Sequence, residues 1–449
     1  MSEAKKPKKV AILTNFVNFN PGYSLTGIVF DQALMLQAHG WEVHLYTNEN
    51  FGSDNASFDP ANPAGDGFNP FEVDIDYEKK FPVHIHHKIP LAHLKDYRSV
   101  NDVSEEHLEY VKKLQAFLIE ELADFDIAFT HDWIFTGWNL PYALALQGIS
   151  DHLPDIRWMH WIHSIPTAHS DWWDIRRYGG KHRIIYPNKH DAMFAVENYH
   201  AKISDVVVIP HIKDMRTFWD FHEDTRKFID DFPGVMQSDI VCIYPASTDR
   251  LHAKKLDYVI KILAEVKKRG FTVFFACANQ WATKRNHGEN IESYYKMAHR
   301  NGLRRGEDFV FTSDWIPKYA SGLSKRILRE LYLCANVFIF PTNEETFGLV
   351  APEAGISGAK LMMLNKSLGN QLEINGFCGI YANFGSFHNH FQPADESVYV
   401  RDLAYILISR IRDSEAVVGS TFYRTSYNYD AIYRKYYGPT MGSAMLWGN

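Results

Sequence analysis

Short apolar runs alternate with amphipathic helical segments along most of this chain, and this alternation restricts the possible folds more than any other feature. Residues 10–13 form an all-apolar strand, residues 28–36 follow as a helix that ends at Gly40, and residues 41–46 form the next strand. A strand, a helix and a second strand in this order form a βαβ unit, which builds a parallel sheet. We therefore predict an α/β protein.

The alternation pauses at the charged stretch 214–231 and restarts with the apolar run 240–244. Because 449 residues are too many for one ordinary core, we expect two domains. The predicted parts are a first domain at 1–213, a linker at 214–238, a second domain at 239–425, and a C-terminal segment at 426–449 that crosses back. Further strands are expected at 127–130, 156–162, 184–186, 206–209, 272–277, 309–311 and 335–340, with helices at 104–122, 256–268 and 324–333.

Composition excludes several classes of protein. A net charge of −7 argues against a general polyanion binder. The four cysteines form no C-x-x-C pair, and we expect free thiols in a reducing, cytoplasmic compartment. The basic start, residues 1–9, lacks the apolar segment of a secretory signal. The longest uncharged stretch, 133–150, contains polar residues and glycines, so no membrane span is expected.

Two glutamates flank a glycine turn near three quarters of the chain. Glu345 follows the apolar strand at 335–340, and Glu353 lies in the helix that opens at Gly348. A helix start offers free amides to a phosphate, and the candidates here are the amides of Phe347, Gly348, Leu349 and Val350. Glu345 is then placed for sugar hydroxyls or developing positive charge, and Glu353 for a ribose diol. The alternative is that one Glu caps its own helix and the other faces water.

Five motifs along the chain match one known family in order. They are Phe-Thr-His-Asp-Trp at 129–133, Val-Ile-Pro-His-Ile-Lys-Asp at 208–214 with Phe218, Asp-Arg-Leu-His-Ala-Lys-Lys-Leu-Asp at 249–257, the glutamate motif at 341–355, and Gly-Asn-Gln-Leu-Glu at 369–373. The third resembles G-R-L-x-x-x-K-G-x-D, and the fourth resembles P-S-x-x-E-G-F-G-L-V-x-L-E-A-M. Together they resemble retaining glycosyltransferases of the GT-B fold, in the group 1, glycogen-synthase-like superfamily.

The resemblance implies two Rossmann-like, doubly wound parallel-sheet domains that face a central cleft, and transfer of a sugar from a nucleoside diphosphate donor, expected to be a UDP-sugar, to a hydroxyl with retention. It implies that Arg250 and Lys255 grip the diphosphate, that Glu345 and Thr346 lie at the donor sugar, and that His131 faces the sugar across the cleft. His163 is expected to lie behind the residues that touch the sugar, and His160 is the alternative candidate for that position. No cofactor and no essential metal are expected.

The sequence indicates places for three further groups of residues. Gly22 and Gly27 are expected in the donor-binding loop of the first domain, although Tyr23-Ser24 replaces the family's Gly-Gly. Trp315 and Ile316 are expected either to form the base pocket or to pack in the core. The histidines at 84, 86 and 87 are of the residue type that binds metals. They are expected to be structural, with a metal site as the lesser alternative, because alternation along a strand divides them between two faces.

The acceptor stays open. Tryptophans, a tyrosine and basic residues are interleaved between residues 157 and 183, and such a track suits a carbohydrate acceptor or hydroxymethylated DNA bases flipped out of the duplex. A buried aromatic core with solvated cations explains the same residues. A nucleotide-sugar epimerase and an inactive binding module remain alternatives, because one fold hosts several functions. The oligomeric state is not predicted.

Overall fold

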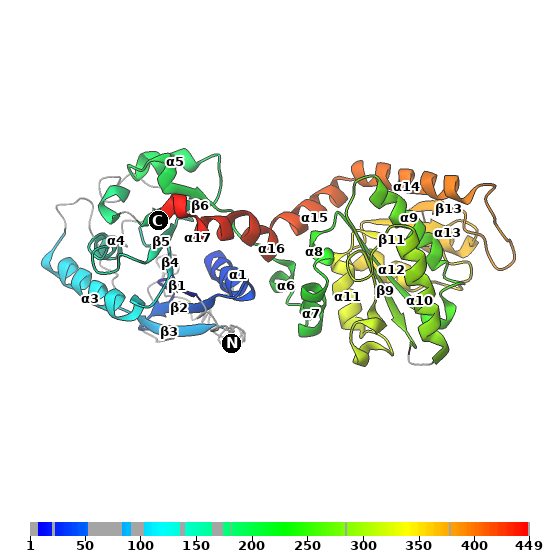
Figure 1. Cartoon of the computed structure of the whole chain (residues 1–449), viewed down its shortest axis with the longest axis horizontal. Coiled ribbons are helices and arrows are strands. Elements are labelled where there is room, and N and C mark those ends of the chain that lie inside the picture. Colours follow the sequence, from blue (N-terminus) through cyan, green and yellow to red (C-terminus); the bar gives the residue numbers. More distant parts are fainter. Residues whose placement is uncertain are drawn as a thin grey trace, which may run out of the picture. The chain divides into compact units, whose positions relative to one another are not determined.

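The computed structural model describes residues 8–19, 23–52, 83–90, 103–134, 140–163, 174–179, 181–282, 285–376 and 379–447. The chain divides into two compact units, one made of Met1–Lys213 with Tyr429–Asn449 and the other of Asp214–Asn428. Each unit contains one parallel sheet with helices packed on it (Figure 1). The predicted α/β class, with two doubly wound parallel sheets, is confirmed.

The sheet of the first unit has the strand order β3-β2-β1-β4-β5-β6-β7. Its strands are β1 (Lys9–Leu13), β2 (Glu42–Asn48), β3 (His84–Ile89), β4 (Ile127–His131), β5 (Arg157–Trp161), β6 (His182–Tyr186) and β7 (Val206–Val208). Its helices before residue 213 are α1 (Ser24–Ala38), α3 (Glu105–Leu122), α4 (Leu140–Gln147), η6 (Ile175–Tyr178), α5 (Ala192–Asn198) and η7 (Ile203–Asp205).

Burial explains why these segments fold as predicted. From Val10 to Leu13, β1 is fully buried, as expected for a central parallel strand that is covered on both faces. The helix α3 buries Leu114, Leu118 and Leu122 on one stripe, and Ser104 caps its start by accepting a hydrogen bond from the His107 amide.

The C-terminal segment packs on the first unit as α16 (Tyr429–Ile432), the π-helical turn η11 (Tyr433–Tyr437), α17 (Gly438–Gly442) and α18 (Ala444–Trp447). The Tyr429 hydroxyl donates to Asp31 Oδ1 over 3.1 Å, and Trp41 Nε1 donates to the Tyr433 hydroxyl over 2.9 Å. Arg157 donates to the Met441 carbonyl over 2.6 Å. The first unit is therefore built from both ends of the sequence.

The sheet of the second unit has the order β10-β9-β8-β11-β12-β13. Its strands are β8 (Ile240–Ser247), β9 (Val273–Gln280), β10 (Phe309–Phe311), β11 (Val337–Phe340), β12 (Leu361–Asn365) and β13 (Ile380–Ala382). Its longer helices are α9 (Leu256–Lys268), α10 (Arg285–Arg300), α11 (Lys325–Cys334), α12 (Val350–Ser357), α13 (Gly369–Asn375), α14 (Glu396–Arg412) and α15 (Glu415–Ser426). Its 3-10 turns are η8 (Thr248–Arg250), η9 (Thr312–Asp314) and η10 (Pro317–Tyr319).

The segment expected as a linker, 214–238, forms the helices α6 (Met215–Phe218), α7 (Glu223–Asp231) and α8 (Gly234–Gln237) of the second unit. Phe228, Val235 and Met236 are buried in the second core, so these helices are part of that unit. The charges that suggested a linker lie on the outer side of these helices or pair locally, as Arg216 does with Asp214 at 2.8 Å.

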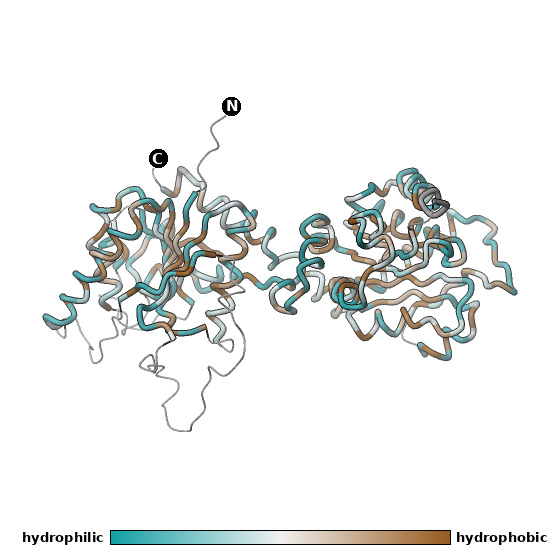
Figure 2. Tube along the Cα trace, turned by 90° about the horizontal axis from the view of Figure 1, so that it is seen from below, coloured by the Kyte–Doolittle hydropathy of each residue, from teal (hydrophilic) through white to brown (hydrophobic). Residues whose placement is uncertain are grey.

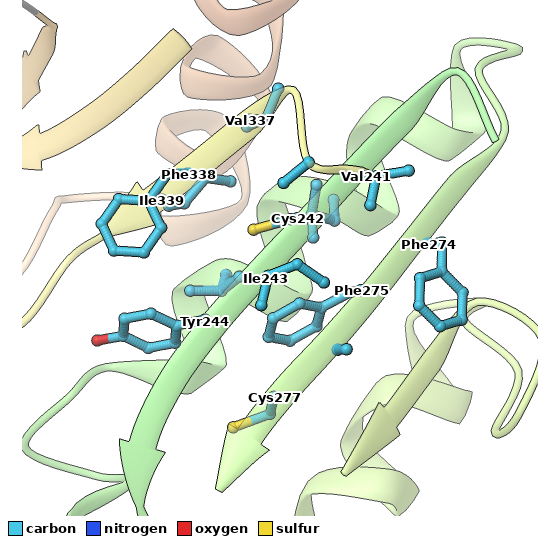
Figure 3. Close-up of a cluster of buried hydrophobic side chains, with 14 of the residues drawn as sticks. Val241, Cys242, Ile243, Tyr244, Phe274, Phe275, Cys277, Val337, Phe338 and Ile339 are labelled. Atoms are coloured by element: carbon cyan, nitrogen blue, oxygen red, sulfur yellow. The ribbon is translucent and has the colours of Figure 1, made fainter. Parts of the chain in front are cut away.

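Apolar residues concentrate along the strands of each unit, whereas hydrophilic residues dominate the outer turns (Figure 2). In the second core, Tyr244 and Cys242 of β8 lie beside Phe338 of β11 (Figure 3). Three of the predicted free thiols, Cys242, Cys277 and Cys334, are free and buried, while Cys378 lies outside the described residues. Among the described helices, none has both the length and the apolar composition needed to cross a membrane.

Candidate functional site

The strand order of the second sheet reverses between β8 and β11, its two neighbouring central strands, which are parallel to each other. With this strand order, the connections on the two sides of the β8–β11 pair run in opposite directions, and ligands of such sheets bind beyond the carboxyl ends of those strands. The loop 248–255 follows β8, and the loop 341–349 follows β11. These loops carry two of the five sequence motifs.

Lys254 and Glu345 join the two loops. The Lys254 Nζ atom lies 2.6 Å from Glu345 Oε2, and both side chains are largely buried, with 11% and 21% exposed. The Tyr244 hydroxyl donates to the Lys254 carbonyl over 3.0 Å, which fixes the backbone beneath the ammonium. An ammonium at this distance makes a charge-assisted hydrogen bond that holds the carboxylate in one orientation.

Lys255, the predicted diphosphate ligand, is not the lysine that reaches Glu345. Its backbone has a φ of 51°, the left-handed conformation that glycine adopts most easily. Counted back from Asp257, the pattern K-G-x-D places its lysine at 254 and its glycine at 255. The structure therefore brings Lys254 to the site, because the loop is one residue shorter than the pattern.

Arg250 ends η8 and pairs with the neighbouring glutamate, Glu344. Its Nη2 atom lies 2.7 Å from Glu344 Oε1, and this pairing raises the pKa of the guanidinium. Half of the Arg250 side chain is exposed. A second cation thus lies at the same switch point, in reach of solvent and of an incoming anion.

The turn at Gly348 requires glycine. Its φ is 81°, and a Cβ atom there would lie 3.0 Å from the Phe340 ring and 3.1 Å from Glu345 Cγ. Asn370 donates to the carbonyls of Glu345 and Thr346 over 2.6 and 2.8 Å. The start of α13, the fifth sequence motif, therefore holds the carbonyls of this loop.

The loop amides are left for a ligand. In the described part of the chain, the amides of residues 347–350 donate to no acceptor, whereas the Ala351 and Glu353 amides bond within the helical turn. The side chains of Phe347 and Leu349 are 48% and 65% exposed. A helix start with free amides beside two cations has the chemistry that suits an anion.

Glu353 lies on the second turn of α12. One carboxylate oxygen accepts from Lys325 Nζ over 2.5 Å, and the other, Oε2, is buried and accepts no hydrogen bond from the described residues. A buried carboxylate oxygen without a hydrogen-bond donor is costly unless a ligand supplies one. The two hydroxyls of a ribose, the predicted partner of Glu353, can donate hydrogen bonds to such an oxygen.

Trp315 follows β10 and serves packing. Its ring stacks on Tyr319 with centroids 5.4 Å apart, meets Phe228 edge-on at 5.0 Å, and donates Nε1–H to Asp231 over 2.7 Å. Ile316 is a partly buried neighbour of the same core. Of the two interpretations made from the sequence, the contacts agree with packing.

His131 ends β4 at the switch point of the first sheet, where β1 and β4 are neighbours. Both ring nitrogens have partners: Nδ1 lies 2.8 Å from His163 Nε2, and Nε2 lies 2.8 Å from Gln32 Oε1. Only 2% of the residue is exposed, and burial lowers the pKa of His131 to about 3. The imidazole is neutral, and within this unit it holds its neighbours in place.

His163 lies directly beyond β5 and stacks between His131 and His211, with ring centroids 5.0 and 5.1 Å away. The Nδ1 atoms of His163 and His211 are buried and have no partner among the described residues. His160, the rival of His163, belongs to a separate buried chain with Thr130 and His182. Sequence reasoning missed Gln32 and His211, because nothing in the local sequence indicates contacts across the sheet.

The glycines expected in the first loop have different outcomes. Gly22 lies outside the described residues. Gly27 is part of α1, exposed, and would have no atom within 4 Å of an added Cβ. Gly27 therefore lies on the surface of a helix and not in a tight turn that could enclose a phosphate.

The aromatic residues between 157 and 183 are mostly core. Trp158, Trp161 and Tyr178 are at most 1% exposed, so their faces are not available to a sugar or a base. Trp172 and Trp173 lie outside the described residues. The buried-core interpretation holds for the three that are described.

No protein-family model matches the chain, and none of the curated proteins matches it in sequence. Solved structures match it along nearly its whole length. A glycosyltransferase from Rickettsia africae is 12% identical over 96% of this chain and 97% of its own, with a TM-score of 0.33. Anabaena HepE in complex with UDP-glucose is 12% identical over 95% and 97%, with a TM-score of 0.33.

Sucrose-phosphate synthase from Thermosynechococcus elongatus is 15% identical over 95% of this chain and 96% of its own, with a TM-score of 0.30. At this degree of similarity, function has to be argued from the side chains of the site.

Proposed function

We propose that this protein is a retaining glycosyltransferase that takes a sugar from a nucleoside diphosphate donor, with a UDP-sugar as the expected donor. The observation that carries the proposal is the Lys254–Glu345 pair beside Arg250 and the unpaired amides of residues 347–350, all at the switch point of the second sheet. Cations, free amides and a carboxylate that can accept hydroxyls match the phosphates and the sugar of such a donor.

Each group has a role in this proposal. When the bond between sugar and diphosphate breaks, negative charge grows on the departing oxygen, and Arg250, Lys254 and the helix-start amides stabilise it. Glu345 orients the sugar and stabilises the positive charge that develops on its ring. Glu353 Oε2 accepts the ribose hydroxyls. The acceptor hydroxyl attacks from the side that the diphosphate leaves, and a phosphate oxygen takes its proton.

The acceptor is proposed to be a carbohydrate or another small hydroxyl compound. The burial of Trp158, Trp161 and Tyr178 means that these three rings offer no stacking surface, either to a sugar or to a DNA base. No bound metal or cofactor takes part in the proposed reaction, since the charge on the diphosphate is met by side chains and amides.

The proposal is tested by incubating the purified protein with a panel of sugar nucleotides and measuring nucleotide release, with and without glycan acceptors. We expect slow hydrolysis of one donor, faster release with an acceptor, and a mass gain of one sugar on that acceptor. Release of no nucleotide from any donor, together with no binding of UDP, GDP or ADP, would contradict the proposal. An isomerised sugar nucleotide would instead identify an epimerase.

The stereochemistry needs its own measurement. Nuclear magnetic resonance of the first product formed should show the same anomeric configuration as the donor. Inversion would remove the retaining mechanism while leaving the glycosyltransferase proposal intact.

A further inference from the structure

A second group of polar side chains lies in the first unit, on the outer strands β2 and β3. The parallel register places His84 opposite His44 and His86 opposite Tyr46. His84 and His86 share one face of the sheet with His44, because side chains two residues apart point the same way. Glu42, two residues before His44, lies on this face as well.

The alternation expected from the sequence holds, since His87 faces the other side and contacts the Thr47 hydroxyl at 2.5 Å. What the local sequence did not reveal is the neighbouring strand. The sheet register adds two ligand-type residues, Glu42 and His44, to the histidines of β3.

The side chains of this face converge. One ligand atom each from Glu42, His44 and His84 lie within 4.8 Å of one another. His44 Nε2 lies 3.0 Å from Glu42 Oε1, and the rings of His44 and His84 stack with centroids 4.7 Å apart. Three ligands bound to a tetrahedral ion at about 2.0–2.1 Å lie about 3.4 Å apart, so a small rotation of the exposed His84 ring closes the site.

We propose that Glu42, His44 and His84 bind a divalent transition-metal ion of the Zn²⁺ type, with a water in the fourth position. Imidazole and carboxylate ligands suit Zn²⁺, and two histidines with one glutamate form a known three-ligand set for it. The ion would join the edge strand β3, through His84, to β2, through Glu42 and His44, in addition to the strand hydrogen bonds.

His86 supports His44 in this site. Its Nε2 atom lies 2.9 Å from His44 Nδ1. A metal on His44 Nε2 requires the proton on Nδ1, and His86 Nε2 is placed to accept it. Such a partner fixes the tautomer and the ring orientation of a metal-bound histidine.

One cation is a competitor for Glu42. Lys9 Nζ lies 3.6 Å from Glu42 Oε1 and also lies over the Phe125 ring. At this distance the Lys9 ammonium leaves the second carboxylate oxygen of Glu42 available to the ion. The Lys9 side chain is 21% exposed, so the ammonium can turn away from Glu42 into solvent.

Another convergent group, His222, Glu223 and Asp224, is a weaker candidate. His222 Nδ1 accepts the Asp224 amide at the start of α7, and Lys318 already pairs with both oxygens of Asp224 at 2.8 Å. These ligand atoms serve a helix cap and an ion pair, so the group in β2 and β3 is the one that a metal fits.

The site is tested by titrating Zn²⁺ into the full chain, previously treated with a chelator and desalted, with calorimetric detection. We expect one Zn²⁺ per chain, bound about tenfold or more weakly after His84→Ala and after Glu42→Gln. His87→Ala is the matched control, because it removes a histidine of the same strand from the opposite face, and it should bind like the unchanged protein.

Circular dichroism of each variant checks that the fold is kept, which the exposure of His84 favours. Co²⁺ supplies a second readout, since a tetrahedral site gives strong visible absorption that His84→Ala should abolish. Equal Zn²⁺ binding by all variants, or no binding by the unchanged protein, would overturn the proposal. Neither result would bear on the donor site of the second unit.

Discussion

The ammonium of Lys254 lies 2.6 Å from Glu345 and ties the loop after β8 to the loop after β11. If this pair holds the donor, Lys254→Ala should reduce kcat by about 10²–10³, the usual loss when one charge-stabilising group is removed. The measurement is the initial rate of nucleotide release at saturating donor.

The neighbouring lysine is the control for this prediction. Lys255→Ala removes the same charge from the adjacent residue, and we expect a rate within about twofold of the unchanged protein. A large loss in Lys255→Ala with none in Lys254→Ala would return the role to Lys255.

Gly348→Ala should destabilise the second unit and distort the site. The residue has a φ of 81°, and its new Cβ atom would meet the Phe340 ring at 3.0 Å and the Gln371 amide at 3.2 Å. The combined strain should cost about 1–3 kcal/mol of unfolding free energy, measured by urea denaturation.

Gly419→Ala provides the comparison in the same unit. Gly419 lies inside α15, and no atom lies within 4 Å of an added Cβ. Alanine there should stabilise by roughly 0.5–1 kcal/mol, because it favours the helix. Equal effects of the two substitutions would show that the turn does not depend on glycine.

Much of the fold follows from short-range patterns. The helix predicted at 256–268 is α9, and the strand predicted at 309–311 is β10, because apolar spacing and flanking turns define both. The helix α10 escaped prediction, since few apolar residues mark it. The helices of 214–238 were mistaken for a linker because their charges outnumber the apolar residues that they bury.

The candidate site was predictable in type and less so in its members. Glu345 and Gly348 could be located from the strand and helix around them. Aligned from Arg250, the motif places its lysine at 255, whereas aligned from Asp257 it places the lysine at 254, because the loop is one residue shorter than the pattern. Contacts between elements that are distant in sequence, such as His131 of β4 with Gln32 of α1 or His44 of β2 with His84 of β3, depend on helix packing and sheet register, which no single segment of sequence contains.

Glu353 should provide selectivity for ribose over deoxyribose. Its buried Oε2 atom has no donor among the described residues, so a ribose hydroxyl would complete it. We expect Glu353→Ala to bind UDP about tenfold or more weakly, the value of one hydrogen bond to a charged group. Its preference for UDP over 2′-deoxy-UDP should disappear in the same calorimetric titration.

Glu373→Ala is the matched control for Glu353→Ala. Glu373 is an exposed glutamate of α13, in the fifth motif. If its removal weakens UDP as much as the removal of Glu353, the effect is one of overall charge, and the ribose assignment fails.

The first unit should lose stability as the pH falls below about 6.5. Burial lowers the pKa of His131 and of His160 to about 3, and it also lowers the pKa values of His163, His182 and His211. A lowered pKa in the folded state means that the unfolded chain binds more protons below pH 6.5. Acid therefore favours unfolding.

His131 and His160 should each lower the free energy of unfolding by about 2 kcal/mol between pH 7 and pH 5. Asp132 acts in the opposite direction, because burial raises its pKa to about 6 and protonation relieves that cost, by about 1 kcal/mol over the same range. The histidines outweigh it, so the net change is a loss.

Urea denaturation at pH 7, 6 and 5, followed by the fluorescence of the buried tryptophans, measures this loss. His160→Asn should reduce the slope of unfolding free energy against pH by about 1.4 kcal/mol per pH unit between pH 5 and 6, because one proton fewer is taken up on unfolding. A stability that stays constant or rises from pH 7 to pH 5 would mean that these imidazoles are already protonated in the folded protein, and the neutral histidine network of the first unit would have to be abandoned.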